Sequence, residues 1–314
     1  MSKQFDLICI GMALIDSIIR GFDPEPISAS GYRAASASLN VGGEAVNEAV
    51  AAAKLGAKTA ILCALGQDDA GSMVLNCLRQ SGVDVSRVIP GPATPVTTMF
   101  VDADGNRKSI TNTSHRFNFH PEQRLDAFAD ARGLILGSLF RAPFDDPQVI
   151  HAVLAAARAN GQTVIADTKL PNFRVLKLSD VASSLPLIDY ITPNEDEARY
   201  FTGKSSPEDM ADTLLRLGAR HVIIKLGSKG CLMKTKDKTV RLPAYGIQAV
   251  DATGAGDNFA AGFASEILRG AADEEALRFA NACGAICATQ VGAGAALRSR
   301  EQVLRFMEET PFKA

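Results

Sequence analysis

The chain has 314 residues, of which 46% are hydrophobic, and a formal net charge of -2 at pH 7. This composition allows a sizeable core, and the balanced charge, without a run of Lys or Arg, argues against a nucleic-acid partner. The apolar N-terminal stretch is interrupted by Asp16 and lacks a small-residue cleavage site, so it predicts a first strand and not a signal peptide. We therefore expect a cytoplasmic protein without a membrane partner.

Short apolar runs alternate with helix-length amphipathic segments along most of the chain. The expected strands are residues 6–11, 59–66, 133–139, 163–167, 189–193 and 221–227. The expected helices are residues 43–55, 71–81, 147–160, 206–218, 257–269 and 273–290. Four of these helices are closed by a glycine, namely Gly56, Gly82, Gly161 and Gly270. This alternation predicts an α/β fold with a parallel sheet and crossover helices.

Two segments, residues 12–41 and 94–113, interrupt the alternation with β patterns that have no helices between them. The second contains Asp104-Gly105, a strong signal for a hairpin turn. Early β insertions in an α/β chain commonly cover the sheet edge where ligands bind. We therefore expect a single domain over residues 1–314 that carries a small β-sheet lid.

The six cysteines lie in apolar surroundings without CxxC spacing, which favours reduced core thiols over disulfides or zinc. Cys283 and Cys287 share a helix face. The chain has four histidines and no HExxH motif, so this pair does not predict a metal-thiolate site.

Residues 250–263 read VDATGAGDNFAAGF, in which two glycines precede Asp257 at the start of a helical pattern. Asp is favoured at a helix start for reasons of capping alone. The same arrangement suits an anion, because Gly254 and Gly256 let the backbone N–H groups approach it closely. Asp257 would then serve as a base toward a nucleophile that attacks a phosphoryl group. Local physics leaves both interpretations open.

Two further helix starts carry polar side chains. Gly42-Gly43 precedes a helix on which Asn47 lies one turn after Gly43, where it would bind substrate hydroxyls or simply be a solvated residue of an Ala-rich helix. Asn194 and Glu197 form a capping pattern. The same spacing would also present both side chains to a hydrated magnesium ion.

Glycine-rich stretches elsewhere narrow the type of nucleotide site. KLGSKG (225–230) follows a strong strand and either lines nucleotide phosphates or is a plain hairpin with solvated lysines. No GxxxxGK[ST] motif occurs, which excludes a P-loop at the motif level. VGAGAA (291–296) does not follow the strand-to-helix GxGxxG pattern, and the first strand is followed by Gly11 alone, so a dinucleotide dehydrogenase is disfavoured.

Together, the motif from Gly42 to Asn47 and the signature DATGAGDNFAAGF resemble the ribokinase family of carbohydrate kinases, also called the PfkB family. The resemblance covers essentially the whole chain. It implies a three-layer α/β sandwich with a mostly parallel central sheet and a β-sheet lid. It also implies transfer of the γ-phosphoryl group of ATP to a hydroxymethyl group.

The resemblance also implies roles for individual residues. Asp257 would be the catalytic base, and the N–H groups of Thr253, Gly254, Ala255 and Gly256 would form the anion hole. Asp16, Gly43 and Asn47 would bind the sugar. Lys225, Gly227, Gly230, Thr253 and Asn281 would contact ATP, with Asn281 at the adenine. Asn194 and Glu197 would hold Mg2+ through water, and Asp251 would belong to a monovalent-cation site of the kind that binds K+.

Three departures from the family pattern bear on the substrate and the cation. A compact DxNxR run is replaced by Asp167 followed at longer spacing by Asn172 and Arg174. Glu44 follows the double glycine, and its charge disfavours a phosphorylated sugar. Ala296 stands where some cation-activated members have a hydroxyl ligand.

The leading hypothesis is an ATP-dependent kinase of an unphosphorylated ketose, pentose or sugar acid. A nucleoside kinase of the same family is the alternative, followed by a nucleotide or metabolite sensor without turnover, against which Asp257 and its glycines argue. Residues 96–101 of the lid alternate so that apolar side chains occur on both faces. One face would close over the sugar, and the other predicts a homodimer joined through the lids.

Overall fold

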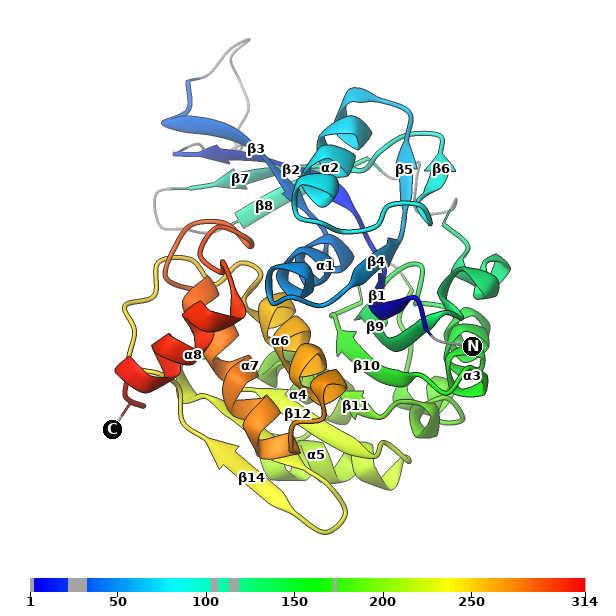
Figure 1. The fold of residues 1–314 in the computed structure, drawn as a ribbon, viewed down its shortest axis with the longest axis vertical. Helices are drawn as coiled ribbons and strands as arrows, with labels where there is room; N and C mark the ends of the chain where they lie inside the picture. Colours follow the sequence, from blue (N-terminus) through cyan, green and yellow to red (C-terminus); the bar gives the residue numbers. More distant parts are fainter. Residues whose placement is uncertain (1–2, 22–32, 103–106, 113–118, 172–173, 314) are drawn as a thin grey trace.

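The central feature of the computed structural model is an eight-stranded sheet with the strand order β14-β13-β12-β11-β10-β9-β1-β4 (Figure 1). Residues 3–21, 33–102, 107–112, 119–171 and 174–313 are described. The strands are β1 (Phe5–Ile10), β4 (Thr59–Leu62), β9 (Ala131–Leu139), β10 (Thr163–Thr168), β11 (Tyr190–Ile191), β12 (His221–Lys225), β13 (Cys231–Lys234) and β14 (Thr239–Leu242). The pairs from β4 to β12 are parallel, and β13 and β14 continue the sheet as antiparallel strands.

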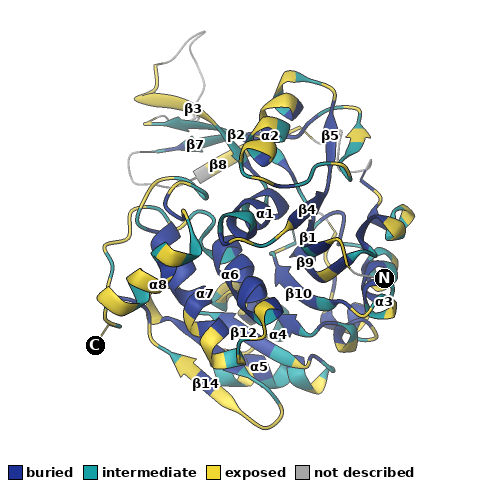
Figure 2. Ribbon diagram, in the orientation of Figure 1, coloured by how far each residue is buried: buried dark blue, intermediate teal, exposed yellow. Residues whose placement is uncertain are grey.

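Side chains of the central strands alternate between two buried cores, one on each face of the sheet. In β1, Leu7 and Cys9 belong to one core, while Ile8 and Ile10 belong to the other. The first core includes α1 (Glu44–Lys54), α6 (Ala255–Arg269) and α7 (Asp273–Cys287). The second includes α3 (Pro147–Ala159), α4 (Glu195–Thr202) and α5 (Pro207–Arg216). The helices therefore cover both faces of a buried sheet, which is the expected three-layer sandwich (Figure 2).

A separate four-stranded sheet lies beside the sandwich, with the order β3-β2-β7-β8 (Figure 1). Its strands are β2 (Leu14–Arg20), β3 (Ser36–Gly42), β7 (Val96–Val101) and β8 (Arg107–Thr111). These strands come from the two segments that interrupt the sequence pattern. The expected turn at Asp104-Gly105 lies outside the described residues.

One cross-strand row of the small sheet joins Leu39, Ser17, Thr98 and Ile110, and the next row joins Asn40, Asp16, Thr97 and Thr111. Neighbouring rows point to opposite faces of a sheet. Leu39 and Ile110, which are 60% and 69% exposed, therefore lie on the face opposite to Asp16.

The structure differs from the sequence prediction at four elements. The expected strand 59–66 breaks at Cys63, because its neighbour β1 ends at Ile10, opposite Leu62. The chain then continues as β5 (Ala64–Gly66), which pairs with β6 (Ile89–Gly91). The expected helix 273–290 ends at Cys287, and α8 (Arg300–Glu309) was not predicted. The expected helix 71–81 is α2 (Asp69–Gln80).

Among the described residues, no helix combines the length and the apolar character that crossing a membrane requires.

Candidate active site

The start of α6 contains two glycines, Gly254 and Gly256, and a side chain would not fit at the first of them. Gly254 adopts a left-handed conformation with φ 76°, and a Cβ there would lie 2.3 Å from the Cβ of Ala293. A Cβ on Gly256 would lie 3.1 Å from Nζ of Lys225. The backbone at the helix start therefore packs directly against a loop on one side and a lysine on the other.

Two of the N–H groups at this helix start donate to other parts of the protein. The N–H of Thr253 donates to Oδ1 of Asp251 at 3.0 Å, and that of Ala255 donates to the carbonyl of Ala252 at 3.1 Å. For Gly254 and Gly256 no N–H acceptor is found within the described parts of the chain. Of the four N–H groups expected to form an anion hole, Gly254 and Gly256 are thus the two without a protein acceptor, because the turn that begins the helix uses the others.

Asp257 is buried in the first turn of α6, where it is 4% exposed. Its Oδ2 accepts a hydrogen bond from Nδ2 of Asn47 at 2.7 Å, and Nζ of Lys169 lies 3.7 Å from its Oδ1. Burial raises the pKa of Asp257, and the Lys169 ammonium opposes this rise. The arrangement makes the carboxylate a stronger base while two donors stabilise its charged form.

Asn47, which we expected beside the sugar, is a direct hydrogen-bond partner of the candidate base. Asp16 reaches the same region from β2, since a Cβ on Gly42 would lie 2.4 Å from its Oδ2. Gly43, with φ 98°, precedes α1 and leaves no room for a Cβ beside the carbonyl of Met12. The two glycines thus bring Asp16 of the small sheet close to the start of α1.

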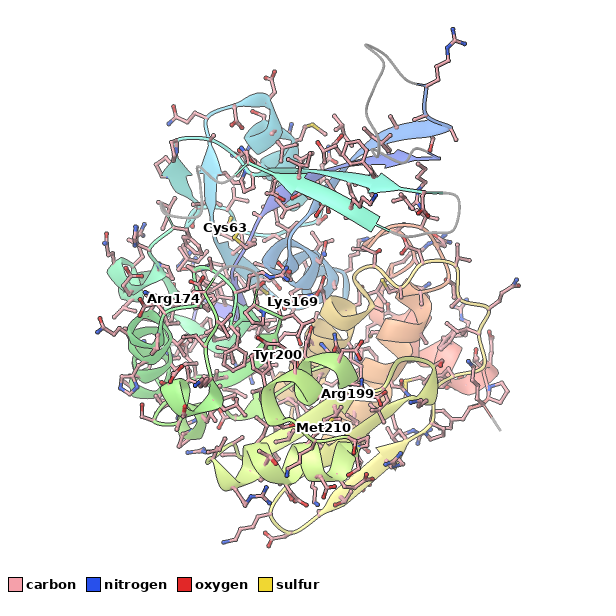
Figure 3. All side chains as sticks on the ribbon, turned by 180° about the vertical axis from the view of Figure 1, so that it is seen from behind. Cys63, Lys169, Arg174, Arg199, Tyr200 and Met210 are labelled. Atoms are coloured by element: carbon pink, nitrogen blue, oxygen red, sulfur yellow. The ribbon has the colours of Figure 1, made fainter. Side chains whose placement is uncertain are left out.

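Glu44, the first residue of α1, adds a second acid on this side. Burial and the nearby Glu44 raise the pKa of Asp16 to about 6. Lys169 bridges the acids, with Nζ 3.7 Å from Oε1 of Glu44 as well as from Asp257. Lys169 directly follows β10, and its side chain is 27% exposed (Figure 3).

Glu48, one turn after Glu44 on α1, is fully buried, and neither of its carboxylate oxygens has a hydrogen-bond partner among the described residues. Glu48, Asp167 and Asp257 each offer a carboxylate oxygen within 4.8 Å of the others. Burial raises the pKa of Glu48 well above its usual range, and the charges of Asp257 and Asp167 raise it further. Glu48 is therefore the member of this cluster that keeps its proton.

Asn194 and Glu197 form the expected capping box at the start of α4. Glu197 N donates to Oδ1 of Asn194, and Asn194 N donates to Oε2 of Glu197, each at 2.9 Å. Thr168 also donates to Oε2 of Glu197 at 2.8 Å. The cap uses this one carboxylate oxygen, and both side chains line the pocket described next. An oxygen donor set at a pocket wall fits a hydrated Mg2+.

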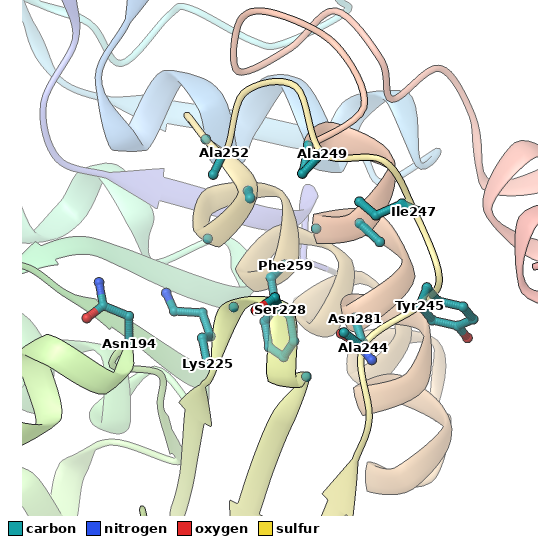
Figure 4. Close-up of a pocket in the computed structure, with 18 of the residues that line it drawn as sticks. Asn194, Lys225, Ser228, Ala244, Tyr245, Ile247, Ala249, Ala252, Phe259 and Asn281 are labelled. Carbon is teal, nitrogen blue, oxygen red and sulfur yellow. The ribbon is translucent and has the colours of Figure 1, made fainter. Parts of the chain in front are cut away.

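A pocket of about 590 Å³ runs from the start of α6 to the far side of α7 (Figure 4). At one end it contains Asn194 and Lys225, whose Nζ lies 2.5 Å from Oδ1 of Asp167. At the other end its wall is mostly apolar and includes Ala244, Tyr245, Ile247, Ala249 and Ala288. Such a slot fits a flat, apolar ring joined to a charged tail.

The remaining residues expected at a nucleotide also line this pocket. Gly227 and Gly230 lie in the turn between β12 and β13, so KLGSKG is a hairpin turn that also contributes to the pocket wall. Asn281 lines the apolar end, where its Nδ2 donates to the carbonyl of Pro243 at 2.8 Å. Its amide nitrogen therefore fixes the chain that follows β14.

Asp251, which we expected in a monovalent-cation site, is hydrogen-bonded within the protein. Its Oδ1 accepts hydrogen bonds from both N and Oγ1 of Thr253, and its Oδ2 accepts one from Gly292 N. The carbonyl of Ala293 accepts from Nδ2 of Asn258 at 2.7 Å. Each of these oxygens therefore accepts at least one hydrogen bond from a donor of the protein.

Asp167 and Arg174, which depart from the spacing of the family pattern, lie in different parts of the structure. Asp167 belongs to the buried carboxylate cluster, whereas Arg174 pairs with Asp146 at 2.6 Å at the start of α3. Asn172 lies outside the described residues.

Lys169 and Glu48 were not predicted as site residues from the sequence. The available signal for Lys169 was its place at the carboxyl end of a parallel strand, where ligands commonly bind.

Comparisons with known proteins show similarity to carbohydrate kinases. The sequence model of the pfkB family carbohydrate kinases matches residues 4–300. The chain is 30% identical to a ribokinase of Haemophilus influenzae, over 85% of this chain and 87% of that protein. It is also 30% identical to fructokinase-1 of Oryza sativa subsp. japonica, over 85% and 88%. The structure of Arabidopsis thaliana ribokinase complexed with ribose and ATP matches with a TM-score of 0.84 and 26% identity, over 98% of this chain and 99% of that one.

The buried, protonated state of Glu48 makes the stability of the protein depend on pH. Above the ordinary value of 4.5 the unfolded chain loses the Glu48 proton while the folded chain keeps it, so this group costs stability as pH rises. Glu48→Gln keeps the shape of the neutral carboxylic acid and removes its ionisable group. We expect its melting temperature to exceed that of the wild type at pH 8 by about 3 °C or more, with a smaller difference at pH 5.

Thermal unfolding followed by circular dichroism at both pH values measures this difference. Glu308→Gln, which changes an exposed glutamate, is the control and should alter neither value. A Glu48→Gln variant that melts well below the wild type at pH 8 would show that Glu48 is ionised and paired in the folded protein.

Proposed function

This chain belongs to the pfkB family of carbohydrate kinases, and on this basis we propose that it transfers the γ-phosphoryl group of ATP to a hydroxymethyl group of an unphosphorylated sugar. The observation that carries the proposal is the position of Asp257. It is a buried carboxylate next to Gly254 and Gly256, whose N–H groups have no acceptor among the described residues, and all three residues line the pocket. A base and an anion-binding backbone therefore meet at one point.

In the proposed reaction the sugar hydroxyl oxygen bonds to the γ-phosphorus, the bond to the β–γ bridging oxygen breaks, and ADP leaves. The hydroxyl proton moves to Asp257. The N–H groups of Gly254 and Gly256 stabilise the negative charge on the transferred phosphoryl oxygens, which is where most of the rate enhancement of such transfers originates. Asn47 and Lys169 hold Asp257 in its charged form until the proton arrives.

ATP would occupy the 590 Å³ pocket, with its adenine between Tyr245, Ile247 and Asn281 and its phosphates toward Lys225. Gly227, Gly230 and Thr253 contribute the backbone along this path. Mg2+ would be held through water by Asn194 and Glu197. When bound, the ion would supply charge neutralisation at the phosphate oxygens.

The charge around Asp16 narrows the substrate class. Asp16 and Glu44 place two carboxylates on the sugar side, with Lys169 as the counter-charge between Glu44 and Asp257. Carboxylates accept hydrogen bonds from hydroxyls and repel phosphate. A neutral ketose or pentose fits this charge better than a phosphorylated sugar or a sugar acid. Relatives named ribokinase and fructokinase support the same class.

The small sheet is proposed to act as a lid over the sugar and as the contact between two copies of the chain. Asp16 lies on one face of the sheet, and the exposed Leu39 and Ile110 lie on the other. A four-stranded sheet with an uncovered apolar face is stabilised when a second copy covers it. A two-fold contact between lids would provide that cover in a cytoplasmic homodimer.

An ATP-consumption assay with a panel of neutral ketoses, pentoses, sugar acids and nucleosides tests the kinase proposal. Asp257→Asn should lower the turnover number with the preferred sugar by about 10²-fold or more, because the proton has no acceptor, while ATP affinity stays near that of the wild type. Asp126→Asn, at an exposed carboxylate outside the pocket, should behave as the wild type. Near-normal turnover in Asp257→Asn removes that residue from the mechanism, and preference for a nucleoside replaces the sugar proposal.

The dimer proposal is tested by a charge on the outer face of the lid. Leu39→Asp should shift the molar mass measured by light scattering from dimer to monomer and raise the KM for the sugar, because an unsupported lid closes less readily. Val175→Asp alters an equally exposed apolar residue outside the lid and should change neither. A wild-type protein that is monomeric at micromolar concentration contradicts the dimer and leaves the kinase proposal intact.

A further inference from the structure

The anion-hole backbone depends on a loop that follows α7. Ala293 lies where a side chain on Gly254 would otherwise be, and the carbonyl of Ala293 accepts from Nδ2 of Asn258. The same Nδ2 lies 2.8 Å from the carbonyl of Gly254. Gly292 N donates to Asp251, whose other oxygen holds Thr253. A shift of this loop, residues 291–296, would therefore move the N–H group of Gly254.

Lys54 is the side chain that ties this loop to α1. Its Nζ donates to the carbonyl of Gly294 at 2.6 Å, and no carboxylate of the described residues lies within salt-bridge distance of it. Partial burial lowers the pKa of this ammonium, so its stabilisation depends on the dipoles of its neighbours. Lys54, at the end of α1, therefore places a positive charge beside the carbonyl oxygen of Gly294. Residues 291–296 contain no Lys or Arg of their own.

α1 also carries Asn47, which bonds to Asp257. Asn47 and Lys54 are two helical turns apart, so they lie on the same side of the helix. Helix α1 thus contacts the candidate base through the amide of Asn47, and it contacts the 291–296 loop through the ammonium of Lys54. Relative movement of α1 and the 291–296 loop would change the distance between the base and the phosphoryl-binding N–H groups.

We propose that the Lys54 ammonium holds the 291–296 loop against the anion hole in place of a bound monovalent cation, as a positioning residue for phosphoryl transfer. The charge is part of the chain, and the carboxylate of Asp251 and the carbonyls of Ala293 and Gly294 already accept protein donors. Turnover of the wild type is therefore independent of K+. The turnover readout rests on the proposed kinase function, whereas the conformational readout below does not.

The test compares the wild type with Lys54→Met, which keeps most of the side-chain volume and removes the charge. In buffer with choline as the only monovalent cation, Lys54→Met should lower kcat about tenfold or more, with little change in the KM for the sugar, because the N–H groups are misplaced. Added K+ or NH4+ should restore part of the loss in the variant and change the wild-type kcat less than twofold. Lys58→Met, four residues further along, is the control and should match the wild type.

Hydrogen–deuterium exchange gives the readout that is independent of turnover. Residues 291–296 should exchange faster in Lys54→Met than in the wild type in choline buffer, and K+ or NH4+ should slow that exchange in the variant alone. Unchanged exchange and unchanged kcat in Lys54→Met overturn the proposal, as does a wild-type kcat that requires K+. A lower kcat that no cation restores also overturns it, since it would reflect packing and not charge. If no sugar is phosphorylated, the exchange result alone decides on Lys54.

Discussion

The structure depends on keeping one buried carboxylate charged among other acids. Asp257 is almost fully enclosed, close to Asp167 and Glu48, and burial alone would favour its protonated form. Lys169 and Asn47 counteract this tendency, one with charge and one with a hydrogen bond. Glu48 relieves the repulsion by staying neutral. Asp257, the candidate base, and Glu48 thus differ in protonation because their environments push their pKa values apart.

Helix α1 connects the parts of the site. Glu44, Asn47 and Glu48 follow the spacing of one helical face, and Lys54 lies further along the same side. Glu44 lies near Lys169, and Asn47 donates a hydrogen bond to Asp257. Glu48 belongs to the buried carboxylate cluster, and Lys54 donates to the carbonyl of Gly294. Since Gly42 and Gly43 join the small sheet directly to this helix, movement of that sheet would be transmitted to the base.

The sequence predicted the sandwich well because its strands are buried on both faces and its helices end at glycines. Helix α8 was missed because it buries only Val303, although Ser299 and Gln302 give a capping signal. At the site, Asp257 and the glycines stood in a recognisable motif. Lys169 and Glu48 did not, because their roles arise only when β10, α1 and α6 meet in space. Likewise, no residue pattern specifies which N–H groups at the start of α6 donate within the turn and which remain without a protein acceptor.

The central claim is that Lys169 keeps Asp257 ionised. It is tested most directly by the pH dependence of kcat/KM for the sugar substrate, measured in the wild type and in Lys169→Met. Removing the ammonium should raise the pKa of Asp257, so the acidic limb of the profile should move to higher pH by about one unit or more. Lys169→Arg, which keeps the charge, should leave the limb near its wild-type position. An acidic limb that stays in place in Lys169→Met would contradict the account, because Asp257 would then remain ionised without its cation.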